Sequence, residues 1–441
     1  MKLNVIILAA GAALALHTAA RAAPVLMISI DGLRPADVIE ADQRGFTAPN
    51  LRKLMAEGAW STGVRNSLPT VTYPNHTTLI TGVWPAKHGV ANNTVFDPEQ
   101  RNLGGWYWYA EDIKVPTLWD AVHGSGGKVA SLSWPVSVGA RAVDYNIPEY
   151  WRARIPEDIK IVHALATPGL IPELEHKSGV GYARAFGADP ASDEARAALA
   201  AALIELKKPK FMTLHLVSLD ETEHDFGPGS PEARATVAVI DRAVGKLVAA
   251  ARKAEPDLVV AIVSDHGFAA VEHNVNLIGA FAEAGLISID PKTRKVTSWQ
   301  AVPWGGASAA VVLKNPGDEA VKAKVKALLN RLAADPENGV NRIIDSDEIA
   351  RMGGTPKASY WIDFKIGYSM GGSQTHISPS TQKGTHGWFP DHPEMRASFF
   401  ISGPGVPKKG SIGEIDQRDI APTVAKIMKV SLPSADGKAL F

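Results

Sequence analysis

Acidic and histidine side chains gather in four short clusters that could bind metal ions. The clusters are ISIDG, SLDETEHDFGP, VSDHG and KGTHGW, and they contain Asp31, Asp220, His224, Asp265, His266 and His386. Carboxylate and imidazole are ligands that zinc prefers, and the chain has no cysteine that could add a thiolate. Each cluster alone is weak evidence, since such residues are common in turns and on surfaces. Together they favour a centre of two metal ions, about 4 Å apart.

A hydroxyl group that could act as a nucleophile lies in the segment PTVTYPNHTTLITG, residues 69–82. Thr72 is expected at the N-cap of a helix, with Pro74 in the first turn, Gly82 at the end and Pro85 just beyond. The start of a helix presents free N–H groups and the positive end of its dipole. The Thr72 hydroxyl is therefore well placed to meet a phosphate, although an ordinary Thr cap is the simpler interpretation of this motif by itself.

The pattern of apolar residues predicts the scaffold that brings these side chains together. Short β-branched runs predict strands at 25–30, 129–132, 211–217 and 258–263, and helical patterns occupy 47–60, 115–122, 189–206 and 230–257. This alternation predicts an α/β protein with a largely parallel central sheet. Open sheets of this kind build their sites at the carboxyl ends of the strands, where the acidic clusters fall.

Two stretches fit this alternation less well. Residues 136–187 are expected to be irregular or a small insertion. Residues 270–380 are expected to form a cap or insertion inside a single domain, with a helix at 319–334 and strands at 309–313 and 360–364. The chain then returns with a strand within 397–405 and a final helix within 418–430.

The first 22 residues predict a secretory signal peptide. Lys2 provides the charged start, an apolar run follows, and Ala20-Arg21-Ala22 forms a cleavage site before a mature chain of residues 23–441. The run is short for a membrane span, so an uncleaved anchor is the less favoured alternative. We expect an exported protein, in a bacterial periplasm or secreted. The formal net charge of zero argues against a nucleic-acid-binding surface, and the oligomeric state is not predicted.

The motifs together resemble the nucleotide pyrophosphatase/phosphodiesterase branch of the alkaline phosphatase superfamily. They are ISIDG, PTVTYPNHTTLITGVWPAKHGVANN, SWP, DETEH, SDHG and GTHGW, and they extend over nearly the whole mature chain. The resemblance implies an alkaline-phosphatase-like core, with a largely parallel sheet flanked by helices on both faces and a small cap or insertion. It also implies hydrolysis of a small phosphodiester or nucleotide substrate.

The resemblance further implies a role for each motif residue. Thr72 would be the nucleophile and would form a phosphothreonine intermediate. One Zn²⁺ would be held by Asp31, Asp265, His266 and the Thr72 oxygen, and a second by Asp220, His224 and His386. Asn93 would donate its amide N–H to a phosphoryl oxygen. Thr70, Asn75 and His76 are expected to be structural.

The choice between a diester and a monoester substrate depends on charge near Thr72. No Lys or Arg lies between Thr72 and Lys87, which favours a singly charged diester. A cation from Lys114, Lys128, Arg152 or Arg154 would instead support a phosphomonoesterase or a phosphonoacetate-hydrolase-like enzyme. A metal-binding protein without turnover is a third hypothesis, which the complete set of motif residues disfavours.

A diester also needs a pocket for its second ester group, and aromatic side chains could line it. Tyr73, next to the nucleophile, is the favoured residue to stack a nucleobase or cover a choline-like cation. The other candidates are Trp106, Tyr107, Trp108, Tyr109, Trp134, Tyr150 and Trp151.

Overall fold

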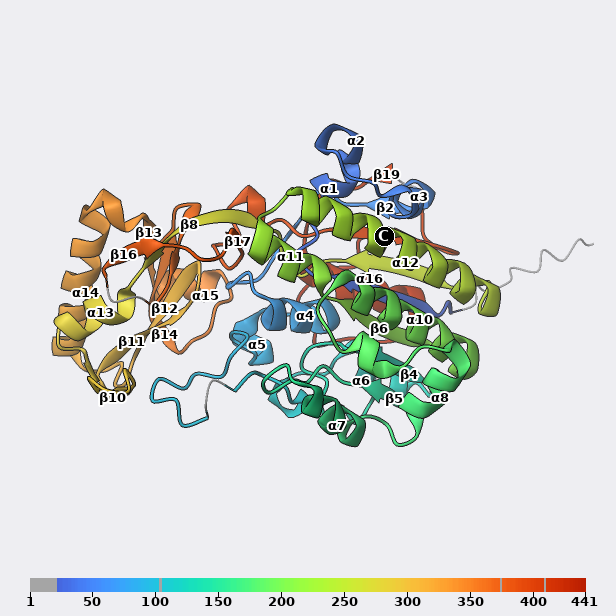
Figure 1. The fold of residues 1–441 in the computed structure, drawn as a ribbon, viewed down its shortest axis with the longest axis horizontal. Helices are drawn as coiled ribbons and strands as arrows, with labels where there is room; N and C mark the ends of the chain where they lie inside the picture. Colours follow the sequence, from blue (N-terminus) through green and yellow to red (C-terminus); the bar gives the residue numbers. More distant parts are fainter. Residues whose placement is uncertain (1–21, 103–104, 373–374, 408–409) are drawn as a thin grey trace, which may run out of the picture.

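The computed structural model describes residues 22–102, 105–372, 375–407 and 410–441, and Figure 1 shows it as a ribbon. Its main sheet is eight-stranded, with the order β19-β2-β18-β7-β1-β6-β4-β5. The parallel part comprises β5 (Tyr145–Ile147), β4 (Val129–Leu132), β6 (Phe211–Leu216), β1 (Val25–Ile30) and β7 (Val259–Val263). At one edge lie β18 (Phe399–Ser402), antiparallel to β7, and the short strands β2 (Ala59–Trp60) and β19 (Gly410–Ser411). The predicted α/β class with a largely parallel sheet is confirmed.

Alternate residues of β1 supply two hydrophobic cores, one on each face of the sheet. Leu26 and Ile28 join the core that contains apolar residues of α3 (Pro49–Glu57), α10 (Pro190–Lys207) and α12 (Pro231–Ala254). Val25 and Met27 join the core that contains residues of α4 (Thr72–Thr81), α6 (Leu118–Gly124) and α16 (Ile420–Met428). Since successive side chains of a strand point to opposite faces, helices cover the sheet on both sides. This explains why the strand sequences are apolar throughout.

The stretch 136–187 was expected to be irregular or a small insertion; it holds regular structure, so the first of these two alternatives was wrong. It contains β5, which pairs with β4 at the edge of the sheet, and the helices α7 (Pro156–Leu165), α8 (Leu170–Ser178) and α9 (Tyr182–Ala185). These helices are short, and α8 is bounded by Gly169 and Gly179, both in the left-handed conformation. A run of so few turns gives little hydrophobic periodicity, and this is why the pattern was missed.

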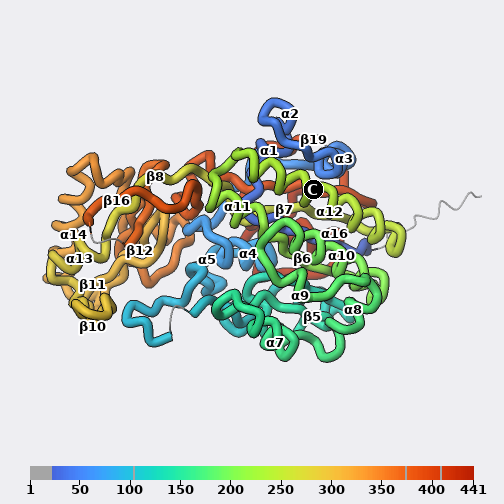
Figure 2. The backbone as a smooth tube through the Cα atoms, viewed as in Figure 1, coloured from blue at the N-terminus to red at the C-terminus, as the bar shows by residue number. Residues whose placement is uncertain are grey.

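Between β7 and β18 the chain forms a lobe at one end of the molecule, yellow to orange in Figure 2. An antiparallel sheet runs in the order β11 (Ala301–Gly305), β12 (Ser308–Leu313), β14 (Ala358–Phe364), β13 (Val340–Asp345). The lobe has its own hydrophobic core, with α13 (Leu277–Glu283) and α14 (Glu319–Ala334) packed in it. The other elements between β7 and β18 are β8 (Ala269–Val275), β9 (Ile287–Ile289), β10 (Val296–Trp299), α15 (Ser346–Arg351), β15 (Gly367–Met370), β16 (Ile377–Pro379) and β17 (Gly384–Thr385). We propose that this lobe is an insertion within one catalytic domain, because the chain returns to the main sheet through β18.

The predicted signal peptide falls almost entirely on residues 1–21, which lie outside the described residues. Within the described part of the chain, no helix has the length and apolar character that a membrane span requires.

Candidate functional site

Three neighbouring strands of the main sheet carry the acidic clusters at their carboxyl ends. Asp31 directly follows β1, Asp265 follows β7, and α11 (Ser218–Phe226), which carries Asp220 and His224, follows β6. Because β6, β1 and β7 lie side by side and parallel, their carboxyl ends meet at one edge. His386 reaches the same place from the segment after β17.

Tight turns after the strands hold the ligand-bearing residues close to the sheet. Gly32 follows Asp31 with a φ of 73°, a conformation that residues with a side chain rarely adopt. Its N–H donates to Asp265 Oδ1 at 3.3 Å, which ties the ends of β1 and β7 together. At Gly267 a Cβ would overlap the carbonyl oxygen of Glu394. Both glycines are therefore required by the backbone geometry.

Asp31, Asp265 and His266 form the first of two groups able to hold a metal ion. One ligand atom from each lies within 4.8 Å of the other two. His266 Nε2 lies 3.0 Å from Asp265 Oδ2 and 3.4 Å from Asp31 Oδ1. The Thr72 hydroxyl lies 3.4 Å from the same nitrogen. The structure thus brings together all four residues of the first predicted zinc position.

The second group contains Asp220, His386 and again His266, within the same 4.8 Å limit. His386 Nε2 lies 3.5 Å from Asp220 Oδ1, and His224 Nε2 lies 3.5 Å from Asp220 Oδ2. His224 therefore contacts Asp220 but is not one of the three residues whose ligand atoms all lie within 4.8 Å of one another. The rings of His266 and His386 stack with centroids 3.6 Å apart, so the two groups are contiguous.

Backbone carbonyl groups fix the orientation of all three histidines. Nδ1 of His224 lies 3.0 Å from Gly384 O, that of His266 lies 3.1 Å from Gly267 O, and that of His386 lies 3.1 Å from Thr70 O. A carbonyl oxygen can only accept, so each Nδ1 carries a proton. Nε2 is then the ring nitrogen that faces the carboxylates and that would bind a metal ion once it has lost any proton of its own.

The buried carboxylates have oxygens that the described protein leaves without hydrogen bonds. These atoms are Asp31 Oδ1, Asp220 Oδ1 and Asp265 Oδ2. Burial, reinforced by the Asp265 and Asp220 charges, raises the pKa of Asp31 well above its usual range. Burial disfavours a charge on His266, yet Asp265, Asp31 and Asp220 outweigh it and raise the pKa of His266 to about 9. Such an excess of buried negative charge is costly unless cations compensate it, so this donor set fits divalent metal ions.

Thr72 is the first residue of α4, so the prediction that it caps the helix was wrong by one position. Val71 is the N-cap, with an extended backbone, and its carbonyl accepts from Asn75 N at 3.3 Å. No side chain caps this helix. The Thr72 hydroxyl therefore faces His266 instead of binding a backbone N–H, and it is 8% exposed.

Asn75 and Thr70 hold the segment before the helix. The Asn75 side chain accepts from the N–H and hydroxyl of Ser67 and donates to the carbonyls of Pro69 and Val71. The Thr70 hydroxyl donates to Trp388 O at 2.6 Å and accepts from Gly387 N at 3.1 Å, beside His386. These contacts agree with the structural roles expected for both residues. His76 Nδ1 likewise bonds to Thr72 O, at 2.9 Å.

Asn93 is held by the backbone of Tyr73, the residue that follows Thr72. Tyr73 N donates to Asn93 Oδ1 at 2.8 Å. This contact uses the oxygen of the Asn93 amide and directs its N–H groups away from Tyr73 N. The Tyr73 ring is fully buried and makes edge contacts with Trp106 and Trp108. Its hydroxyl donates to Glu149 Oε1 at 2.7 Å.

Two functional candidates were missed from the sequence, His215 and Glu149. His215 Nε2 lies 2.9 Å from Asp31 Oδ2, and its Nδ1 lies 2.8 Å from Glu149 Oε2. Burial opposes a charge on this ring, but Asp31 and Glu149 raise the pKa of His215 to about 10. The available signal was one histidine inside the apolar strand sequence FMTLHL, which reads equally well as a core residue.

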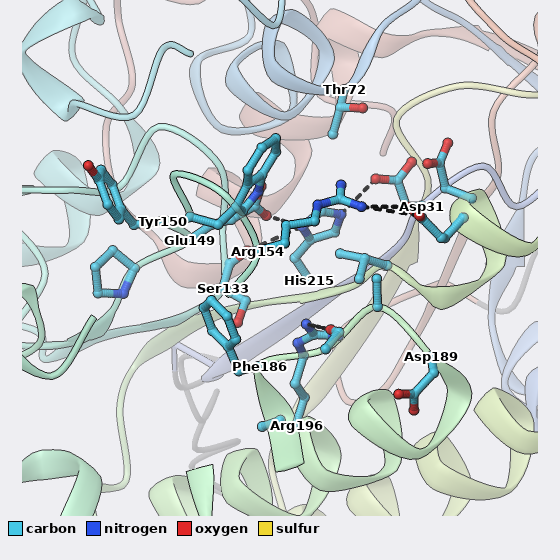
Figure 3. Close-up of a pocket in the computed structure, with 18 of the residues that line it drawn as sticks. Asp31, Thr72, Ser133, Glu149, Tyr150, Arg154, Phe186, Asp189, Arg196 and His215 are labelled. Atoms are coloured by element: carbon cyan, nitrogen blue, oxygen red, sulfur yellow. Dashed lines mark hydrogen bonds and ion pairs between the residues drawn. The ribbon is translucent and has the colours of Figure 1, made fainter. Parts of the chain in front are cut away.

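A cavity of about 460 Å³ opens beside Thr72 and Asp31. Figure 3 shows Glu149, Tyr150, Phe186 and Arg154 around it, and Trp106 and Trp151 also line it. Many of the lining residues lie in the stretch 136–187, whose regular structure the sequence did not reveal. The cavity therefore combines the candidate metal groups with an aromatic wall.

Among the four cations considered from the sequence, Arg154 lines this cavity. Its guanidinium bonds to both oxygens of Glu221, at 3.1 and 2.9 Å, and lies 4.6 Å from the centre of the Trp151 ring. Lys128 pairs with Asp144 at 2.7 Å, and Lys114 donates to Glu111 O at 2.8 Å. The charge of Arg154 is thus already paired with a carboxylate, and Arg196, which also lines the cavity, pairs with Asp193.

Comparison with known proteins relates this site to a family. The family model of type I phosphodiesterase / nucleotide pyrophosphatase matches residues 25–389. An uncharacterized pyrophosphatase/phosphodiesterase of Schizosaccharomyces pombe is 30% identical over 257 residues, 57% of this chain and 46% of that protein. Ectonucleotide pyrophosphatase/phosphodiesterase family member 1 of Mus musculus is 26% identical over 255 residues, 55% of this chain and 24% of that protein. The matches thus span less than half the length of both relatives.

A solved structure shows the same fold. Murine ectonucleotide pyrophosphatase/phosphodiesterase 5, as an inactive variant in complex with AMP, has a TM-score of 0.66 and 17% identity. The match covers 94% of this chain and 97% of that chain. It confirms the alkaline-phosphatase-like core that the sequence motifs implied.

Proposed function

Because the chain belongs to the type I phosphodiesterase/nucleotide pyrophosphatase family, we propose that it is an exported zinc-dependent hydrolase of phosphodiester or phosphoanhydride bonds. One observation carries this proposal. The Thr72 hydroxyl lies at the start of a helix, 3.4 Å from His266, where two groups of candidate ligands meet a cavity. This arrangement supports the proposal of a nucleophile, a cation site and room for a substrate close together.

The residues fit two zinc ions. Asp31, Asp265, His266 and Thr72 would hold one ion, and Asp220, His224 and His386 the other. When bound, the ions would supply Lewis-acid activation of the hydroxyl and charge neutralisation at the leaving oxygen.

Thr72 Oγ1 would attack phosphorus, so that the Thr–O–P bond forms while the bond to the leaving oxygen breaks. A water would then release the phosphoryl group from the phosphothreonine, and two displacements give net retention at phosphorus. Asn93 is the proposed donor to a phosphoryl oxygen. Its Oδ1 already accepts from Tyr73 N, which orients Nδ2 as the free donor.

The cavity supports a diester or nucleotide as substrate. Tyr150 and Trp151 are half-buried and offer aromatic faces to the cavity. Tyr73 would contact the substrate only at the floor, because its ring is fully buried. The murine relative described in complex with AMP makes a nucleoside group a reasonable occupant.

A phosphomonoesterase is the second candidate, and Arg154 is the observation that favours it. A guanidinium beside the phosphoryl position could bind the second charge of a monoester. The ion pair with Glu221 argues against this, because a neutral pair offers little to an additional charge.

The test compares kcat/KM of one zinc-loaded sample for three substrates. They are bis-p-nitrophenyl phosphate, p-nitrophenyl phosphate and thymidine 5′-monophosphate p-nitrophenyl ester. We expect the diesters to exceed the monoester by orders of magnitude and Thr72→Ala to abolish all turnover. A faster monoester would support the second candidate, and a zinc-binding protein without any turnover would refute the enzyme.

Export to a bacterial periplasm is part of the proposal and rests on residues 1–22. Its test is fractionation of producing cells, with the N-terminus of the recovered protein sequenced. A mature chain that starts at Ala23 in the periplasmic fraction is expected.

A further inference from the structure

A histidine near the carboxyl end of β6 connects the candidate metal site to the floor of the cavity. His215 is 1% exposed and pairs in register with Ser29 of β1. Its Nε2 lies 2.9 Å from Asp31 Oδ2, and its Nδ1 lies 2.8 Å from Glu149 Oε2 and 3.2 Å from Ser133 O. The Ser133 carbonyl and the ionised carboxylates of Asp31 and Glu149 accept, so both ring nitrogens donate when these carboxylates are charged. The ring is thus fixed at both ends.

The contact with Asp31 leaves the two oxygens of that carboxylate in different states. Oδ2 accepts from His215, whereas Oδ1 has no hydrogen-bond partner among the residues that the structure describes and lies 3.4 Å from His266 Nε2. Oδ1 is therefore the oxygen turned toward the first ligand group. His215 determines which oxygen of Asp31 is free to bind a cation and prevents the carboxylate from rotating.

Glu149 holds His215 from the opposite side. One of its oxygens accepts from His215, and the other accepts from the Tyr73 hydroxyl at 2.7 Å. Tyr73 is the neighbour of Thr72 in the chain. A continuous series of hydrogen bonds therefore runs from Asp31 through His215 and Glu149 to the start of α4.

We propose that His215 is a positioning residue, held by Glu149, that orients Asp31 toward the first metal position. The proposal rests on the proposed zinc-dependent function for its kinetic part only. Hydrogen bonds to metal-binding side chains typically change metal affinity or activity 10- to 100-fold when removed. His215 itself touches no reacting atom.

The variants His215→Gln, Glu149→Gln and their combination test this role. His88→Gln is the matched control, because His88 is also fully buried and bonds to Thr78 Oγ1 and Val90 N, away from the ligand groups. Zinc affinity is measured by competition with a chromogenic chelator, after thermal melting has confirmed that each variant is folded. We expect His215→Gln to weaken one of two zinc positions by roughly 10- to 100-fold, while the control binds zinc like the wild type.

A second readout separates positioning from general stabilisation. At saturating zinc, we expect His215→Gln to lower kcat for the diester while KM changes little. Glu149→Gln should act in the same direction, and the double variant should be no worse than His215→Gln, because both residues act through Asp31. If His215→Gln does not fold, Glu149→Gln alone tests the positioning role. This variant is expected to fold, because the Glu149 side chain is 14% exposed and glutamine has nearly the same size.

Wild-type zinc affinity together with wild-type kcat in His215→Gln would overturn the proposal. An equal loss in His88→Gln would also overturn it, since the effect would then be general. If the wild-type protein hydrolyses no phosphoester, the proposed function fails, but the zinc competition still decides the role of His215.

Discussion

At the scale of single residues, Asn93 and the metal-binding side chains should have separable tasks. Asn93→Ala removes an amide donor without touching the ligand groups. We expect bound zinc to stay unchanged and kcat to fall by roughly 10²- to 10³-fold, as for one lost donor to a developing oxyanion. Metal analysis and diester kinetics check this. Wild-type turnover in Asn93→Ala would remove Asn93 from the site.

Asp265→Ala and His386→Ala should act on the metal itself. Asp265 belongs to the first ligand group and His386 to the second. We expect each variant to lose activity and to bind fewer than two zinc ions per chain, measured by elemental analysis of dialysed protein. Full metal content in either variant would contradict its assignment as a ligand.

Some of these site residues could be predicted from the sequence, and others could not. Asp31 and Asp265 stand directly after strongly apolar strands, so their place at the sheet edge could be predicted. His215 could not be recognised, because its role depends on Asp31 from β1 and Glu149 from the segment after β5. Only the pairing of β6 with β1 and β4 brings these residues together.

At the scale of elements, the loop before α7 and the helix α11 meet across the mouth of the cavity. Arg154 and Glu221 form this contact, and Glu221 is the neighbour of Asp220. Glu221→Gln would free the guanidinium to bind a second phosphoryl charge. We expect kcat/KM for p-nitrophenyl phosphate to rise relative to the diester, by about tenfold for a gain of roughly 1.4 kcal/mol. Asp225→Asn, an exposed change on the same helix, is the control, and an unchanged ratio would rule out this selection by charge.

The short helix α5 (Pro85–His88), which follows α4, should make stability depend on acid. Burial lowers the pKa of His88 to about 3, from an ordinary value near 6.5. Between these values the unfolded chain binds a proton that the folded chain does not, so stability falls as the pH falls from 6.5 toward 3. The slope for this group is at most about 1.4 kcal/mol per pH unit. Thermal midpoints should show His88→Gln gaining on the wild type as the pH drops, and a constant difference would contradict the buried neutral ring.

The limits of an element could be predicted from the sequence where neighbouring residues set them, and not where contacts with distant residues do. β1 and β4 have the predicted limits, because short apolar runs and turn residues mark them in the sequence. The start of α4 was misplaced by one residue, since Asn75 and not Thr72 organises the turn before it. The helices α7 to α9 were missed because each is too short to show a clear period.

At the scale of the whole molecule, the site joins the carboxyl ends of three strands, α4 and the segment after β17. Removal of metal should therefore destabilise the entire fold, because the carboxylates of Asp31, Asp220 and Asp265 then have only the nearby rings of His266 and His215 to offset their negative charge. Zinc at about 1,000 times its dissociation constant would stabilise the folded state by about 4 kcal/mol. For a chain of this size, this predicts a rise in Tm of about 5 °C over the chelated protein. Thr72→Ala should keep most of this zinc-dependent rise while it abolishes turnover, whereas Asp265→Ala should lose much of it. Equal Tm values with and without zinc would show that the carboxylate cluster is satisfied in another way.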